Sequence, residues 1–160
     1  EIRETLRELR PVRFDDIAAL IALDRPGPRE AGMLDDYIAR ARQTGSARSP
    51  HPLLDAPLSC SRGMIIYQEQ VFLAARLLAG FTPNDADRFR RALAKMRLDV
   101  IEEFEEAFLE GAARQGISAK DAERLFGILS RCGEFAFCRA HAVSYGLIAY
   151  REAYLKANWG

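Results

Sequence analysis

Apolar residues recur at intervals of three and four along almost the whole chain, which is the spacing of one face of an α-helix. Phe14, Ile17 and Leu20 show this spacing in the first clear helix, over residues 14–23. Further helices are predicted over about 30–42 and 65–79, from 83 past 96, from 100 to a break near 115, from 119 past 129, and over 142–156. The sequence contains no convincing strand pattern, repeat or low-complexity tract. The pattern therefore predicts an all-α fold of irregular, multi-helix type.

Local sequence signals mark where several of these helices begin and end. Arg25-Pro26-Gly27-Pro28 stops the helix over 14–23, because proline lacks the backbone donor that a helix interior requires. Gly80 is a good C-cap residue for the helix before it. Thr82-Pro83-Asn84-Asp85 and Ser118-Ala119-Lys120-Asp121 are each typical of an N-terminal capping box. These signals predict helix starts at 83 and 119.

Composition divides the chain into three parts. Residues 44–62 are rich in proline, glycine and serine and form the one candidate linker. Residues 1–43 and 63–160 contain the helices on either side of it. The sequence starts at Glu1 rather than methionine and stops abruptly at Gly160, so we expect a fragment of a longer protein.

Overall composition is that of an ordinary globular protein, with 49% hydrophobic and 29% charged residues. Its 23 basic and 23 acidic side chains cancel, which argues against a polybasic nucleic-acid binder but leaves room for a local basic patch. No apolar run approaches the roughly 18–20 residues that a membrane span needs. Three cysteines and the lack of a secretory signal favour a reduced, cytoplasmic protein without a membrane partner.

A basic segment in the predicted helix that starts at 83 is the first candidate for chemistry. Arg88, Arg91 and Lys95 would lie on one side of that helix, where like charges repel by a few tenths of a kcal/mol per pair. A bound polyanion would remove this repulsion, and the arginine fork suits phosphate oxygens. The alternative is a solvated helix face on which Asp87 pairs with Arg91.

Three cysteines and a histidine form a second, weaker candidate. Cys132, Cys138 and His141, with Cys60 as a fourth ligand, are residue types that zinc accepts. Their spacing lacks the paired knuckles of structural zinc sites, so buried apolar thiols are the simpler interpretation. Bound zinc in elemental analysis would support a small zinc-binding helical module instead.

Two further positions carry polar groups at expected helix starts. Arg139 and His141 lie where a turn leads into the last helix, and free backbone N–H groups attract anions there. An exposed arginine and a histidine bonded to the backbone are the alternative. Glu69 could act as a general base, but it has no partner in the sequence. The run Tyr67-Gln68-Glu69-Gln70 therefore predicts a buried, hydrogen-bonded helix start.

Several stretches together resemble the alpha subunit of bacterial DNA polymerase III, the family C polymerases. The resemblance rests on the following residues, which keep the order and nearly the spacing of that family: Leu6 to Pro11, Ile17 to Leu23, Arg25 to Pro28, Gly63 to Val71, Ala86-Asp87, Arg90 to Leu93, Phe137, Arg139, His141, Tyr145 and Lys156. It covers nearly the whole chain. The matching part of the family is the end of the palm followed by the helical fingers domain, so 1–43 would be palm-to-fingers helices and 63–160 the fingers.

The resemblance implies a DNA-directed DNA polymerase of bacterial replication, with this segment gripping template and incoming nucleotide. Its triphosphate contacts would be Arg90, Arg91, Lys95, Arg139 and His141. The catalytic aspartates and the Mg²⁺ ions they hold would belong to the palm, so we expect no metal and no catalysis in this fragment alone. The expected partners are primed DNA, dNTP, the rest of the polymerase chain, the sliding clamp and other replisome subunits.

Departures from the family pattern leave the branch open. Ala94, Met96 and Cys138 replace a glycine, a lysine and an asparagine or proline. Gly80 to Pro83 is similar to the error-prone, translesion branch, whereas Tyr67 to Gln70 is similar to the replicative branch. The alternative function is a non-catalytic DNA-binding or scaffold paralogue that retains the polymerase helices. Paired aspartates upstream in the parent chain would favour the enzyme.

Overall fold

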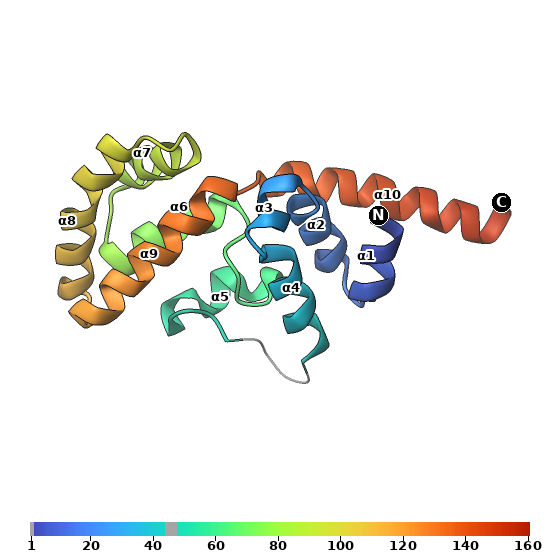
Figure 1. The fold of residues 1–160 in the computed structure, drawn as a ribbon, viewed down its shortest axis with the longest axis horizontal. Coiled ribbons are helices and arrows are strands. Elements are labelled where there is room, and N and C mark those ends of the chain that lie inside the picture. Colours follow the sequence, from blue (N-terminus) through green and yellow to red (C-terminus); the bar gives the residue numbers. More distant parts are fainter. Residues whose placement is uncertain (1, 44–47) are drawn as a thin grey trace. The chain divides into compact units, whose positions relative to one another are not determined.

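The computed structural model describes residues 2–43 and 48–160, which form α-helices and short 3-10 helices (Figure 1). These described residues contain no β-strand, so the predicted all-α fold is confirmed. Contacts between Cα atoms divide the chain into two compact units. Unit 1 comprises Glu1–Ala47 and Phe137–Gly160, and unit 2 comprises Arg48–Ala136. None of the described helices is both long enough and apolar enough to cross a membrane.

Unit 1 pairs the first helices of the chain with the last one. Its elements are α1 (Ile2–Leu9), α2 (Phe14–Leu23), α3 (Pro26–Glu30), α4 (Met33–Arg42) and α10 (Arg139–Trp159). Helix α2 packs against α10 at small residues, because a Cβ atom on Gly146 would already contact Ala18 and the Phe14 ring. The Phe14 and Tyr150 rings meet edge to face with their centroids 6.5 Å apart. Residues more than a hundred positions apart thus share one core.

The start of α2 is fixed by a buried carboxylate. Asp16 is fully buried and its Oδ2 accepts hydrogen bonds from the backbone N–H groups of Val12 and Arg13, at 3.1 and 3.2 Å. The Tyr37 hydroxyl of α4 donates to Asp16 Oδ1 at 2.9 Å. Both carboxylate oxygens therefore have donors, which offsets the cost of burying the charge.

Unit 2 is a helical bundle around a cluster of aromatic rings. Its elements are η1 (Pro52–Leu54), α5 (Asp55–Leu58), η2 (Ser59–Ser61), α6 (Gln68–Ala79), α7 (Pro83–Ala94), α8 (Leu98–Arg114) and α9 (Ala119–Phe135). Five phenylalanines, Phe81, Phe89, Phe104, Phe108 and Phe126, meet at the centre, with neighbouring ring centroids 5.4 to 6.4 Å apart. Helices α8 and α9 lie side by side, and α6 packs against α7 and α8 (Figure 1).

The predicted helix boundaries in unit 2 are confirmed where a cap defines them. Thr82 Oγ1 accepts a hydrogen bond from the Asp85 N–H at 3.2 Å, at the start of α7. Ser118 Oγ accepts one from the Asp121 N–H at 3.1 Å, at the start of α9. Gly80 follows α6 with a φ of 67°, a left-handed conformation that favours glycine.

The stretch predicted as a loop, 44–62, contains short helical turns over 52–61, while 44–47 lie outside the described residues. Leu54 and Leu58 anchor these turns in the core of unit 2. The buried Gln70 amide also holds them, since its Nε2 donates to the Pro57 carbonyl at 3.2 Å and to Ser61 Oγ at 2.6 Å. Its Oε1 accepts from the Tyr67 N–H at 3.0 Å, so the predicted hydrogen-bonded start of α6 is confirmed at Gln70. Glu69 is exposed, so the prediction of a buried position is wrong for that residue.

Candidate functional site

The basic segment lies on α7 and on the turn that follows it. Phe89 and Leu93 are fully buried in the core of unit 2, so α7 turns its basic side chains outward. The helix ends at Ala94, one residue before Lys95, so the prediction that Lys95 lies within this helix is wrong. The Lys95 N–H still donates to the Arg91 carbonyl at 3.2 Å. Lys95 therefore remains one helical turn beyond Arg91, although it caps the helix instead of continuing it.

A small cationic depression forms where α7, this turn and the start of α8 meet. We name it the basic hollow. It has a volume of about 240 Å³ and is lined by Arg88, Arg91, Ala92, Lys95, Arg97 and Val100. Four of these lining residues are basic, and none of the described lining residues is acidic. The structure thus brings Arg91 and Lys95 together with Arg88 and Arg97.

Acidic residues nearby pair with the arginines of the basic hollow without lining it. Arg91 Nη2 lies 2.6 Å from Asp87 Oδ2, and Arg97 Nη2 lies 2.9 Å from Asp99 Oδ2. The Arg91 side chain is 65% exposed, and exposed pairs of this kind contribute little to stability. Lys95 has no ion pair with any residue in the described part of the chain. The solvated-face alternative is right that Asp87 pairs with Arg91, although the same Arg91 side chain also lines the basic hollow.

Arg90 lies in a different environment from Arg91. Its side chain is only 21% exposed, against 65% for Arg91. Its Nε and Nη2 donate to Asp87 Oδ1 at 3.1 and 2.6 Å, and its Nη1 donates to Gln68 Oε1 at 2.9 Å. Gln68 Nε2 in turn donates to the Ala136 carbonyl at 3.3 Å. Arg90 is therefore tied to α6 and to the end of α9.

Asp87 is the residue that connects the two arginines. Hydrogen bonds from Arg90, and then from Arg91, lower the pKa of Asp87 below its usual value of 3.8. Asp87 is therefore ionised at neutral pH and accepts from both guanidinium groups. Sequence spacing indicated only its pair with Arg91. The bond from Arg90 to Gln68 had no local signal, because Gln68 belongs to another helix.

The other two predicted contacts, Arg139 and His141, lie in the first turn of α10 in unit 1. Arg139 Nη2 is 3.9 Å from Asp15 Oδ1. The exposed His141 ring contacts two aromatic rings, with centroid distances of 4.4 Å to Tyr145 and 5.4 Å to Phe137. The predicted helix start is thus present, three residues earlier than expected, and it carries a cation and an imidazole.

No group of three or more histidine, cysteine, aspartate or glutamate side chains within the described residues is placed to hold a metal ion. The geometry therefore gives no support to the zinc-module alternative. Cys132 and Cys60 are partly buried, whereas Cys138 is exposed just before α10.

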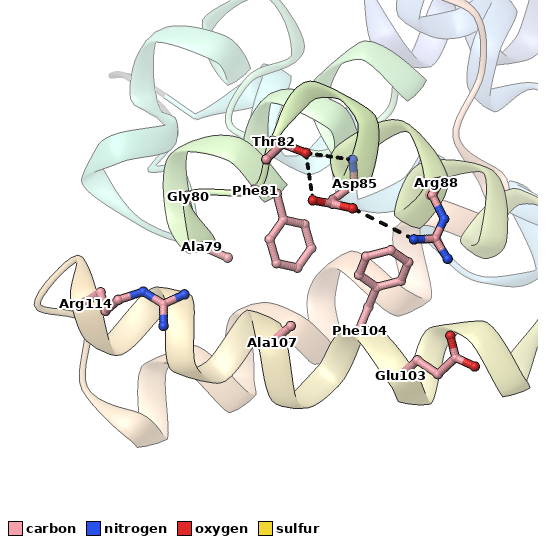
Figure 2. Close-up of a pocket in the computed structure, with 10 residues that line it drawn as sticks. All are labelled: Ala79, Gly80, Phe81, Thr82, Asp85, Arg88, Glu103, Phe104, Ala107 and Arg114. Atoms are coloured by element: carbon pink, nitrogen blue, oxygen red, sulfur yellow. Dashed lines mark hydrogen bonds and ion pairs between the residues drawn. The ribbon is translucent and has the colours of Figure 1, made fainter.

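A larger hollow, of about 390 Å³, lies on another side of α7 (Figure 2). Its lining consists of Ala79, Gly80, Phe81, Thr82, Asp85, Arg88, Glu103, Phe104, Ala107 and Arg114. Figure 2 shows the Phe81 and Phe104 rings at its centre and Arg88 paired with Asp85. Arg88 Nη1 lies 3.9 Å from Asp85 Oδ1. None of the five predicted nucleotide contacts is among these described lining residues. Arg88 lines both this hollow and the basic hollow.

Comparison with known proteins places these helices in a family. The model of the bacterial DNA polymerase III alpha subunit finger domain matches residues 1–116. The chain belongs to this finger-domain family. The predicted resemblance to the alpha subunit is therefore confirmed. The match includes α7 and the basic hollow and ends within the turn that precedes α9.

Individual relatives of the finger-domain family extend the match to nearly the whole chain. The DNA polymerase III subunit alpha of Aquifex aeolicus is 37% identical over 158 residues, which cover 99% of this chain and 14% of that protein. The subunit of Halalkalibacterium halodurans is 41% identical over 158 residues, with the same two coverages. The subunit of Pseudomonas aeruginosa is 35% identical over 163 residues. The chain thus spans about one seventh of the length of these curated relatives.

Proposed function

We propose that this chain is the part of a bacterial DNA-directed DNA polymerase that grips the incoming nucleotide and the template during DNA replication. Its membership of the alpha-subunit finger family supports the enzyme class. The single observation that carries the grip is the basic hollow, where four cationic side chains converge and no described lining residue is acidic. An incoming dNTP brings a triphosphate whose charge must be neutralised, and a concentration of cations suits that task.

In this proposal, the five residues predicted from the sequence bind the triphosphate as two groups. Arg91 and Lys95 contact phosphate oxygens from the basic hollow, and Arg90 contacts them from its less exposed position on α7. Arg139 and His141 contribute a second group of donors at the start of α10, where the backbone N–H groups and the helix dipole also favour an anion.

Catalysis itself belongs to the remainder of the polymerase in this proposal. Mg²⁺ would be held by palm aspartates upstream. The chain alone is expected to be inactive. The proposed partners are primed DNA, dNTP, the rest of the polymerase chain, the sliding clamp and other replisome subunits, in the cytoplasm. The replicative and translesion branches both fit this proposal.

Replacing Arg91 in the full-length polymerase that contains this segment tests the proposal. Single-nucleotide primer extension should give a KM for dNTP about tenfold or more higher in Arg91→Ala, because a charge-assisted hydrogen bond contributes about 1.5–3 kcal/mol. Arg114→Ala is the matched control, since Arg114 is an exposed α8 arginine that pairs with Glu110 and does not line the basic hollow. Its KM should stay unchanged.

Two outcomes would contradict the proposal. An Arg91→Ala enzyme with the parent helix content and an unchanged KM would show that the basic hollow does not grip the nucleotide. A parent polymerase that binds primed DNA but extends no primer would favour the alternative, a non-catalytic DNA-binding or scaffold paralogue.

A further inference from the structure

One carboxylate on α7 holds two adjacent arginines at once. Asp87 lies three residues before Arg90 and four before Arg91, so a single helical turn brings all three side chains together. Each carboxylate oxygen has its own arginine, because Oδ1 accepts from Arg90 at 2.6 Å and Oδ2 pairs with Arg91 at 2.6 Å. The Asp87 side chain is 33% exposed, so the pairs are partly shielded from water.

The two arginines differ in what else they can reach. Arg90 is anchored on its far side by Gln68 of α6, and it is mostly buried. Arg91 has no such anchor among the described hydrogen bonds, and it lines the basic hollow. The chain of contacts runs from Gln68 through Arg90 and Asp87 to Arg91. It links the exposed guanidinium of Arg91 to α6 of unit 2.

We propose that Asp87 is a positioning residue. Its carboxylate is held by Arg90 and orients the Arg91 guanidinium toward the triphosphate. This inference deepens the proposed function and rests on it. Arg90 then acts as a support that keeps the Asp87 carboxylate in place. A guanidinium that is oriented before binding loses less conformational freedom when it meets phosphate oxygens.

Charge alone predicts the opposite effect for the same residue. Asp87 is a negative group beside a site for an anion, so removing its charge would strengthen triphosphate binding if orientation did not matter. The direction of the change in nucleotide affinity therefore distinguishes the two roles. Weaker binding indicates that Asp87 positions Arg91, and stronger binding indicates that Asp87 only neutralises part of the positive charge. Asparagine is the best test, because it keeps the shape but offers one acceptor oxygen where Asp87 offers two.

The experiment uses the full-length polymerase that contains this segment. In single-nucleotide primer extension, Asp87→Asn should raise the KM for dNTP about five- to tenfold and leave kcat within about twofold. Asp87→Glu keeps both oxygens and the charge, and it should recover part of the lost affinity. Glu105→Gln removes one negative charge from an exposed position on α8 and serves as the control, with an unchanged KM. Helix content should match the parent in every variant.

A double-mutant cycle then shows whether Asp87 acts through Arg91. In an Arg91→Ala background, the further change Asp87→Asn should leave the KM unchanged, because no oriented guanidinium remains. An unchanged or lower KM in Asp87→Asn, beside a raised KM in Arg91→Ala, overturns the positioning role and leaves the proposed function intact. An unchanged KM in Arg91→Ala overturns both. Additive effects on the KM in the double variant would overturn the positioning role alone, since Asp87 would then act independently of Arg91.

Discussion

Neighbouring residues of the same type lie in different environments on α7. Successive residues of a helix are rotated by about 100°, so Arg90 faces α6 while Arg91 faces the basic hollow. The first guanidinium is mostly buried and satisfied by a carboxylate and an amide, whereas the second is largely exposed. A single substitution at either position therefore tests a different part of the site, and the arginine pair should not be treated as one unit.

A single glycine decides how closely two core helices approach. Gly111 of α8 lies against the end of α6, and a Cβ atom there would clash with the backbone carbonyl of Ala79. Gly111→Ala should lower the free energy of unfolding by about 2 kcal/mol or more, because backbone must move to make room. Chemical denaturation followed by helix content measures this.

Gly127 of α9 provides the matched control for that substitution. It is also a helical glycine, but a Cβ atom there would meet no atom within 4 Å. Gly127→Ala should therefore raise the free energy of unfolding by up to about 1 kcal/mol, through helix propensity alone. Equal effects of the two changes would mean that close packing at Gly111 is not what limits the approach of α8.

At the scale of the element, the start of α9 is stabilised by the Asp121 carboxylate, whose ionisation depends on pH. Hydrogen bonds from Ser118, and then from Arg124, lower the pKa of Asp121 below 3.8 in the folded chain. A lowered folded pKa means that the carboxylate stabilises the fold above pH 3.8 and that this contribution is lost as the pH falls through the folded value. In urea unfolding, Asp121→Asn should be less stable than the parent chain at pH 7.

Urea unfolding at lower pH shows whether this stabilisation depends on the charge of Asp121. The difference in stability between the parent chain and Asp121→Asn should shrink as the pH falls below 3.8, because the parent carboxyl becomes protonated. Glu106→Gln, on the exposed face of α8, shows the effect of losing one negative charge elsewhere. A difference that stays constant from pH 7 to pH 3 would mean that the Asp121 charge does not stabilise α9.

Elements with local signals were predictable from the sequence. The caps at Thr82 and Ser118 fixed the starts of α7 and α9, because a hydroxyl and the next backbone N–H groups lie within one turn. The turns over 52–61 were missed, since their order comes from contacts with Gln70 and the core of unit 2. The end of α7 before Lys95 also lacked a glycine or proline signal.

At the scale of the whole molecule, distant segments combine in ways that linear order does not reveal. The predicted division at 43 and 62 follows the palm and fingers of the family and stays a prediction. The compact units instead group Phe137–Gly160 with Glu1–Ala47. This grouping comes from the packing of α2 against α10, which the periodicity within each helix does not reveal. The five nucleotide contacts also stay predictions, although Arg91 and Lys95 share one hollow and Arg139 and His141 share one helix turn.

The charge of the whole molecule also conceals its local distribution. The chain has no net charge, yet four basic side chains surround the basic hollow. Within this chain, a salt-dependent attraction for the nucleotide must therefore come from local fields, since its 160 residues carry no net charge. The KM of the full-length polymerase for dNTP should rise steadily across a tenfold range of salt. Lys95 has no ion pair among the described residues, so Lys95→Ala should reduce the slope of this rise, whereas Lys120→Ala, which changes a lysine outside the hollow, should not. Parallel slopes in the three proteins would mean that Lys95 does not meet the triphosphate.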